Sequence, residues 1–76
     1  MSDYLNKIKK IITERTGIDK EELLTSSYFE GDLNIGEMEL IEIISELEET
    51  YHVDLSEMSK NFETIQDIAD ALEEII

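Results

Sequence analysis

Carboxylates are the most abundant side chains in this sequence that could take part in chemistry. Of its 76 residues, 20 are Asp or Glu and 6 are Lys or Arg, so the formal net charge is −14. Six glutamates fall between positions 37 and 49, interleaved with apolar residues. Pairs of carboxylates can act as general acid and general base when a pocket holds them. These lie along one predicted helix, on a convex face rather than in a pocket, and we therefore predict that the protein is not an enzyme.

The spacing of the other polar residues argues against a metal site. The run that begins at Asp32 looks like the start of a calcium-binding loop, but its sixth position, which must be glycine, is Glu37, and its twelfth is Ile43 instead of glutamate. His52 is the only histidine and there is no cysteine. We expect His52 to be solvated or at a helix end, and any magnesium or calcium binding by the glutamates to be loose.

The two signs of charge are unevenly distributed along the sequence. Lys60 is the only Lys or Arg after Lys20. A field of this sign repels nucleic acid and anionic lipid and steers the chain toward basic surfaces. Composition alone leaves two interpretations open, a surface that attracts basic proteins and a charged face that keeps the domain in solution.

Length and composition predict a single domain over residues 1–76, because so short a chain cannot divide its buried surface between two cores. With no cysteine, helix packing must stabilise the fold without disulfides. The sequence shows no signal peptide and no apolar run of about 20 residues. We expect a cytoplasmic monomer that does not insert into membranes.

Apolar periodicity predicts mainly helices. The first covers residues 3–16, with Ser2 as its N-cap and Gly17 just past its end. Residues 18–36 form a long connection with a helical turn at its start. Leu23, Leu24, Tyr28 and Phe29 are expected to anchor this connection to the core.

The second helix is predicted over residues 37–51, with Asn34 at capping distance from Glu37. Its apolar stripe consists of Leu40, Ile41, Ile43, Ile44, Leu47 and Tyr51. No Lys or Arg is near in sequence to neutralise its glutamates. A short helix through Met58 follows, and Thr64 with Asp67 opens the last one.

Three segments resemble acyl carrier proteins. Residues 32–43, DLNIGEMELIEI, are similar to the family's Asp-Leu-Gly-Ala-Asp-Ser-Leu-Asp segment, which continues to Glu-Leu after two further residues. Residues 46–53 resemble the end of its second helix, and residues 64–68 the start of its last. The resemblance covers essentially the whole chain. It implies the family's all-α fold, a small four-helix bundle with three longer helices, a short third helix and a long first loop.

The departure from this pattern lies at the family's modified serine, which phosphopantetheine esterifies and whose attached thiol then carries acyl groups. Here Glu37 stands in place of that serine, Gly36 in place of the aspartate before it and Met38 in place of the leucine after it. A carboxylate cannot form that phosphodiester. The resemblance therefore implies a chain without phosphopantetheine, and no other cofactor is expected.

The family's docking residues are retained. In acyl carrier proteins, acids of the second helix pair with lysines and arginines of partner enzymes. The matching positions here are Met38, Glu39, Glu42, Glu48 and Glu49. The resemblance implies a domain that docks on basic surfaces of carrier-dependent acyl-transfer or synthase enzymes of fatty acid or polyketide type. The alternative is a genuine carrier with unconventional attachment of its acyl or pantetheine group.

Overall fold

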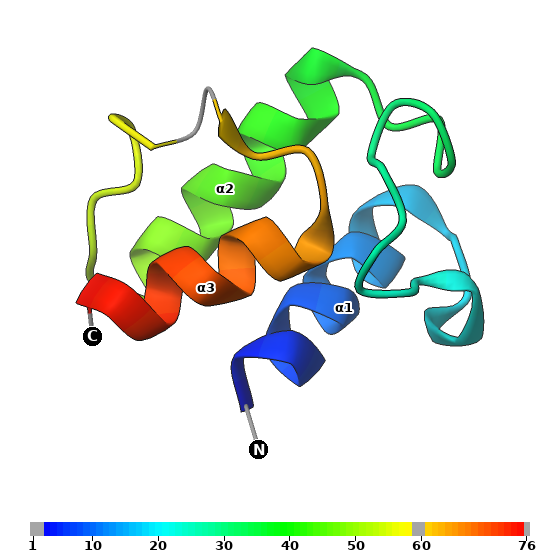
Figure 1. The fold of residues 1–76 in the computed structure, drawn as a ribbon. Helices are drawn as coiled ribbons and strands as arrows, with labels where there is room; N and C mark the ends of the chain where they lie inside the picture. Colours follow the sequence, from blue (N-terminus) through cyan, green and yellow to red (C-terminus); the bar gives the residue numbers. More distant parts are fainter. Residues whose placement is uncertain (1–2, 59–60, 76) are drawn as a thin grey trace.

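Three α-helices make up most of the computed structural model, which describes residues 3–58 and 61–75 (Figure 1). They are α1 (Asp3–Thr16), α2 (Glu37–Tyr51) and α3 (Ile65–Ile75). The 3₁₀ turn η1 (Lys20–Glu22) lies in the connection between α1 and α2. Within the described ranges there is no strand, only one isolated bridge between Tyr28 and Thr64. The prediction of an all-α fold is confirmed.

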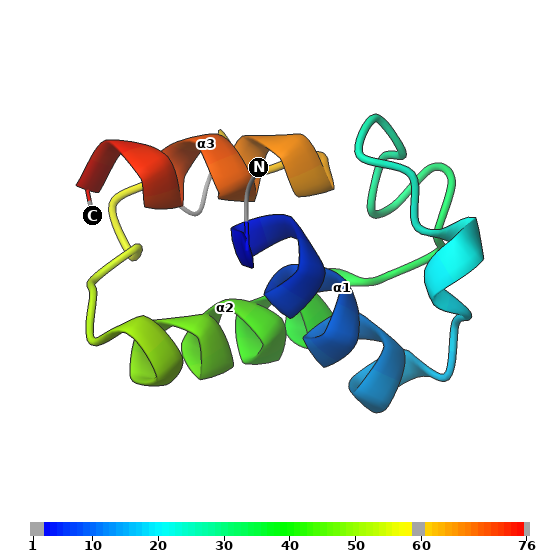
Figure 2. The ribbon, with the colours of Figure 1, turned by 90° about the horizontal axis from the view of Figure 1, so that it is seen from below.

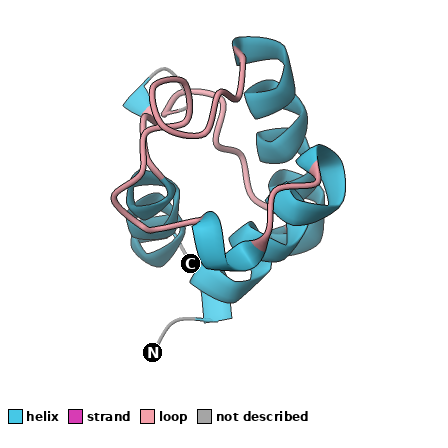
Figure 3. Ribbon diagram, turned by 90° about the vertical axis from the view of Figure 1, so that its right-hand side faces the viewer, coloured by secondary structure: helices cyan, strands magenta, loops and turns pink. Residues whose placement is uncertain are grey.

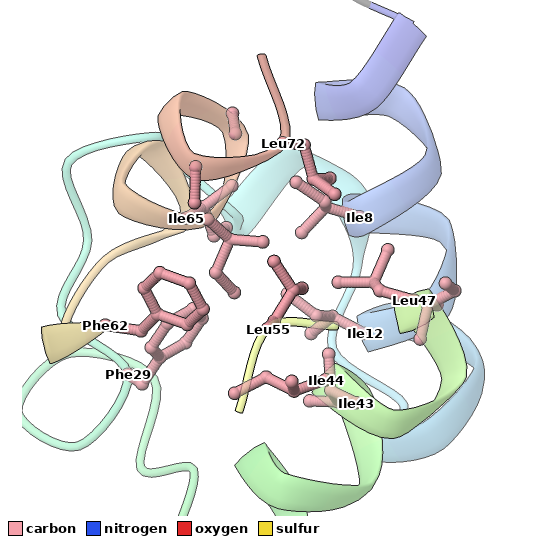
Figure 4. Packing of buried hydrophobic residues seen from close by; sticks show 14 of the residues in the cluster. Ile8, Ile12, Phe29, Ile43, Ile44, Leu47, Leu55, Phe62, Ile65 and Leu72 are labelled. Carbon is pink, nitrogen blue, oxygen red and sulfur yellow. The ribbon is translucent and has the colours of Figure 1, made fainter. Parts of the chain in front are cut away.

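The helices are arranged around α1. It packs against both α2 and α3, while α2 and α3 run in the same direction on either side of it (Figures 1 and 2). Two neighbouring helices that run the same way need a long return, and residues 52–64 provide it. Side chains of the connections fill the space between the helices, with Leu55 near the middle of the core and Phe29 and Phe62 at one edge (Figure 4).

The helix ends follow local backbone chemistry. Gly17 adopts φ +81° and donates its N–H to the carbonyl of Thr13, which ends α1 as predicted. At α3, Thr64 Oγ1 accepts from Asp67 N, and Asp67 Oδ2 accepts from Thr64 N, so the predicted opening of this helix is a reciprocal cap. Ser2, the predicted cap of α1, lies outside the described residues.

The predicted cap of α2 is wrong. The N-cap is Gly36, in an extended conformation and without a side-chain hydrogen bond. Asn34 lies two residues earlier with φ +56°, a left-handed conformation that asparagine tolerates better than most residues. Asn34 therefore lies before the helix rather than at its cap.

The connection of residues 18–36 covers the end of the molecule that faces the viewer in Figure 3. Leu23, Phe29 and Ile35 are buried and anchor it, as expected of a segment that is packed rather than a free linker. Leu24 and Tyr28 are exposed, contrary to prediction, at 61% and 53%. Tyr28 instead holds the connection through its backbone, in the bridge to Thr64.

The predicted short third helix is not confirmed. Residues 56–58 form a turn, closed by the N–H of Met58 donating to the carbonyl of Leu55. Asp54 Oδ1 accepts from the N–H and the hydroxyl of Ser56, which gives the chain a local alternative to a helix. Ser59 and Lys60 lie outside the described residues.

Candidate partner-docking surface

The candidate site is centred on the start of α2. Glu37 is exposed in the first turn, where its carboxylate lies close to the positive end of the helix dipole. Because Gly36 contributes no side chain to cap the backbone N–H groups there, this helix end remains open. Position 37 is therefore an accessible helix start.

The outward face of α2 has apolar residues among its acids. Successive residues of a helix are about 100° apart, so Met38, Ile41, Ser45 and Glu49 share one face opposite the buried Ile43 and Leu47. Met38 is 75% exposed and Ile41 is 53% exposed. The assignment of Ile41 to the buried stripe is wrong, because its direction falls outside the arc that packs on the core.

Two of the acids are paired within the fold. Arg15 of α1 donates from Nε to Glu46 at 2.8 Å and from Nη1 to Glu42 at 3.4 Å. Only the packing of α1 against α2 brings this base to these carboxylates, since no Lys or Arg is near them in sequence. Of the predicted docking residues, Glu42 therefore already has an internal cation beside it.

Glu48 also has an internal partner. Its Oε2 accepts from the backbone N–H of Leu55 at 2.7 Å, and its carbonyl accepts from the N–H groups of His52 and Val53. The side chain of Leu55 is fully buried. Glu48 thus holds the end of α2 to the chain that follows it, whereas Glu39 and Glu49 are exposed.

An open groove of about 770 Å³ adjoins position 37. Its apolar lining comes from three segments and consists of Phe29, Ile35, Leu40, Ile41, Ile44 and Phe62. Tyr28, Glu30, Gly31, Glu37 and Glu63 complete it. The expectation that the carboxylates line only a convex face away from any pocket is wrong for Glu37.

The groove exists because distant segments are held together by backbone hydrogen bonds. Phe29 N donates to the carbonyl of Glu63 at 2.9 Å, and Ile35 N donates to the carbonyl of Phe29 at 2.7 Å. In Figure 4, Phe29 and Phe62 lie on one side of the core, and Ile44 extends from α2. The sequence did not identify Glu30 and Glu63 as part of the site, because no local pattern links these two residues. The exposure of Ile41 could have been predicted from its position around the helix.

The described residues do not suggest other chemistry. No three His, Cys, Asp or Glu side chains converge as metal ligands in the ranges that the structure covers. His52 is exposed and forms the left-handed C-cap of α2, at a helix end as expected. Over the same ranges, no helix has the length and apolar character needed to cross a membrane.

Comparison with known proteins agrees with this all-α fold. Residues 6–72 match the family described as "Phosphopantetheine attachment site". Over 74 residues the chain is 31% identical to the acyl carrier protein of Cyanidium caldarium, and the alignment covers 97% of this chain and 84% of that protein. Acyl carrier proteins are carriers and not enzymes. Since the family match includes the whole of α2 and both long connections, the chain belongs to the acyl carrier protein family.

Proposed function

We propose that this chain is an acyl-carrier-like domain that docks through α2 on basic surfaces of fatty acid or polyketide-type enzymes and carries no phosphopantetheine. The observation that carries the proposal is the outward face of α2. Met38 and Ile41 are exposed there beside the carboxylates of Glu39 and Glu49. An apolar contact surrounded by charges of one sign fits a partner with the opposite sign.

The chemistry of position 37 does not fit the prosthetic group. Phosphopantetheine attaches to a hydroxyl, and Glu37 offers a carboxylate at the open start of α2. Ser45 is exposed on the same helix, but eight residues further along, about 12 Å by the helical rise. Ser27 is buried in the connection. None of these hydroxyls takes the place of the missing serine.

Docking of this kind is expected to be fast, weak and sensitive to salt. Exposed ion pairs contribute only about 0–1 kcal/mol each, so affinity arises from several pairs and from the apolar contact together. Long-range attraction mainly raises the association rate. We further propose that the domain acts as a cytoplasmic monomer over residues 1–76, since its strong negative charge opposes self-association.

Intact-mass spectrometry tests the absence of the prosthetic group. Wild-type protein and Glu37→Ser are incubated with coenzyme A and a broad-specificity phosphopantetheinyl transferase. We expect the mass of one phosphopantetheine on Glu37→Ser and no addition to the wild type. The variant shows that the transferase recognises this scaffold. Addition to the wild type would establish the alternative, a genuine carrier with unconventional attachment.

Binding to a purified carrier-dependent synthase with a basic docking surface tests the partner. Met38→Ser, Glu39→Gln and Glu49→Gln are each expected to weaken binding about two- to fivefold in surface plasmon resonance. Glu73→Gln, an exposed acid of α3, is the matched control for charge. If no such synthase binds the wild type at low salt, the docking proposal is wrong.

A further inference from the structure

The groove beside α2 is a second candidate surface, which shares Ile41 with the outward face of the helix and continues from it toward the connection. One wall of the groove is the first two turns of α2. The other wall is formed by Tyr28–Phe29 and Phe62–Glu63, and a hydrogen bond from Phe29 N to the Glu63 carbonyl joins these two segments. Tyr28 and Ile41 stand half-exposed at its edges. This arrangement leaves apolar surface open to solvent in a small domain whose other large side chains are mostly buried.

The rim of this groove carries one sign of charge. Glu30, Glu37 and Glu63 all line it and all are exposed, and none of the described lining residues is basic. A hydrophobic floor below three carboxylates selects for a ligand that combines an apolar group with positive charge.

The charge also argues against other occupants. A free fatty acid would bring its carboxylate to the three glutamates, and like charges at short distance cost free energy. A second copy of this chain carries the same net charge of −14, which opposes self-association at this face. A basic protein segment avoids both penalties.

We propose that the groove binds a partner segment in which a leucine or phenylalanine side chain is flanked by arginine or lysine. The apolar side chain enters between Ile41 and Phe62, and its basic neighbours pair with Glu30 and Glu63 at the rim. This surface extends the partner contact from the outward face of α2 to the connection and to the residues before α3. It goes beyond the proposed docking on α2. The two surfaces share Ile41, and Glu30 and Glu63, which lie only in the groove, distinguish them.

The probe for the test is a short synthetic peptide in which leucine and phenylalanine alternate with arginine. Its control has the same arginines with serine at each apolar position. Binding is followed by amide chemical shifts of the ¹⁵N-labelled protein. We expect the apolar peptide to bind at least fivefold more tightly than the serine peptide, with the largest shifts at Gly31, Ile35 and Ile41. Dodecanoate should not displace it.

Variants assign the binding to the groove. Ile41→Ser should weaken the apolar peptide about fivefold, and Glu30→Gln and Glu63→Gln about threefold each. Leu24→Ser removes an equally exposed apolar residue outside the groove, and Glu73→Gln removes an acid that does not line it. Both controls should bind the peptide like the wild type, and unchanged circular dichroism melts show that each variant is folded.

Three results would overturn the inference: no binding, equal binding of the serine peptide, or equal losses in the groove variants and their controls. Stronger binding of dodecanoate than of the peptide would assign the groove to fatty acids instead. Peptide binding that follows the expected pattern while no synthase binds α2 would leave the inference standing and reject the proposed function. Synthase binding to α2 without the expected peptide binding would reject the inference and leave the proposed function standing.

Discussion

The six glutamates of α2 have identical side chains but different surroundings. Arg15 pairs with Glu42 and Glu46, and Glu48 accepts a hydrogen bond from the backbone of Leu55. Glu37, Glu39 and Glu49 are exposed to solvent. The acids proposed for partner binding at Glu39 and Glu49 therefore have different surroundings from those with contacts inside the fold.

Glu48 and Glu49 provide a direct comparison between neighbouring acids. Glu48→Ala leaves the N–H of Leu55 without its acceptor next to a buried side chain, and we expect it to lower the free energy of unfolding by about 1–2 kcal/mol. Glu49→Ala should change stability by less than about 0.5 kcal/mol while weakening the synthase complex. Urea unfolding and surface plasmon resonance on both variants check this. Equal loss of stability in the two would contradict the structural role of Glu48.

Asp54 is expected to respond to pH through its contacts with Ser56. Hydrogen bonds from the hydroxyl and then from the N–H of Ser56 lower the pKa of the Asp54 carboxyl below its usual range. The carboxylate therefore favours the folded state above the unfolded pKa, and this contribution is lost as pH falls through the lower, folded pKa. NMR titration should show Ser56→Ala raising the pKa toward the ordinary value. No change would mean that this turn does not form in solution.

At the scale of elements, the helix ends determine how α1 and α2 meet the connection between them. Gly17 ends α1 in a left-handed conformation, with φ +81°, whereas Gly36 starts α2 with φ −77°. A Cβ at either glycine would meet nothing within 4 Å. Substitutions at these two positions therefore test backbone conformation separately from packing.

We expect opposite effects at the two glycines. Gly17→Ala should destabilise the protein by about 1 kcal/mol, because alanine is strained at positive φ. Gly36→Ser should stabilise it by about 0.5–1 kcal/mol, since serine caps the open N–H groups of α2 and restricts the unfolded chain. Urea unfolding followed by circular dichroism measures both. A stabilising Gly17→Ala would contradict the left-handed end of α1.

The contact between α1 and α2 also affects the proposed docking surface. Arg15→Gln should cost about 0.5–1 kcal/mol of stability, because the pairs with Glu42 and Glu46 are partly exposed. It should also strengthen binding to a basic synthase about two- to fivefold, since it releases both carboxylates. Lys10→Gln makes the same charge change elsewhere on α1 and serves as the control. An equal gain in affinity in Lys10→Gln would show that the effect arises from net charge and not from the released carboxylates.

At the scale of the whole molecule, fold stability and partner binding should respond to salt in opposite directions. The molecule measures 27 × 26 × 19 Å, and the Debye length is about 30 Å at 0.01 M salt but about 8 Å at 0.15 M. At low salt all its charges therefore interact, and the net charge of −14 destabilises the compact state.

Raising sodium chloride between these limits should weaken the charge repulsion by roughly 1 kcal/mol. In a domain of this size, that change raises the melting temperature by about 5 °C. The same change should weaken the synthase complex, because it screens attraction as well as repulsion. Thermal melts and binding measurements at matched ionic strengths check both. A melting temperature that falls with salt would show that the internal ion pairs outweigh the repulsion.

Much of the fold follows from the sequence. Apolar spacing located α1, α2 and α3, because a helix that buries one face repeats with the period of the backbone. Local caps were recognised at Gly17 and Thr64, where the chemistry involves residues close in sequence. The prediction for Asn34 was wrong because the path of the connection depends on the rest of the molecule, whereas the exposure of Ile41 follows from its helical phase.

The sequence by itself determined the helices, the negative charge, the carboxylate at position 37 and the resemblance to acyl carrier proteins. Only the tertiary structure decided which acids are exposed and where the groove lies. Arg15 reaches Glu42 and Glu46 because α1 packs on α2, and Glu63 joins the rim because its carbonyl accepts from Phe29. These contacts join residues about 30 positions apart, and such contacts arise from packing rather than from any local pattern.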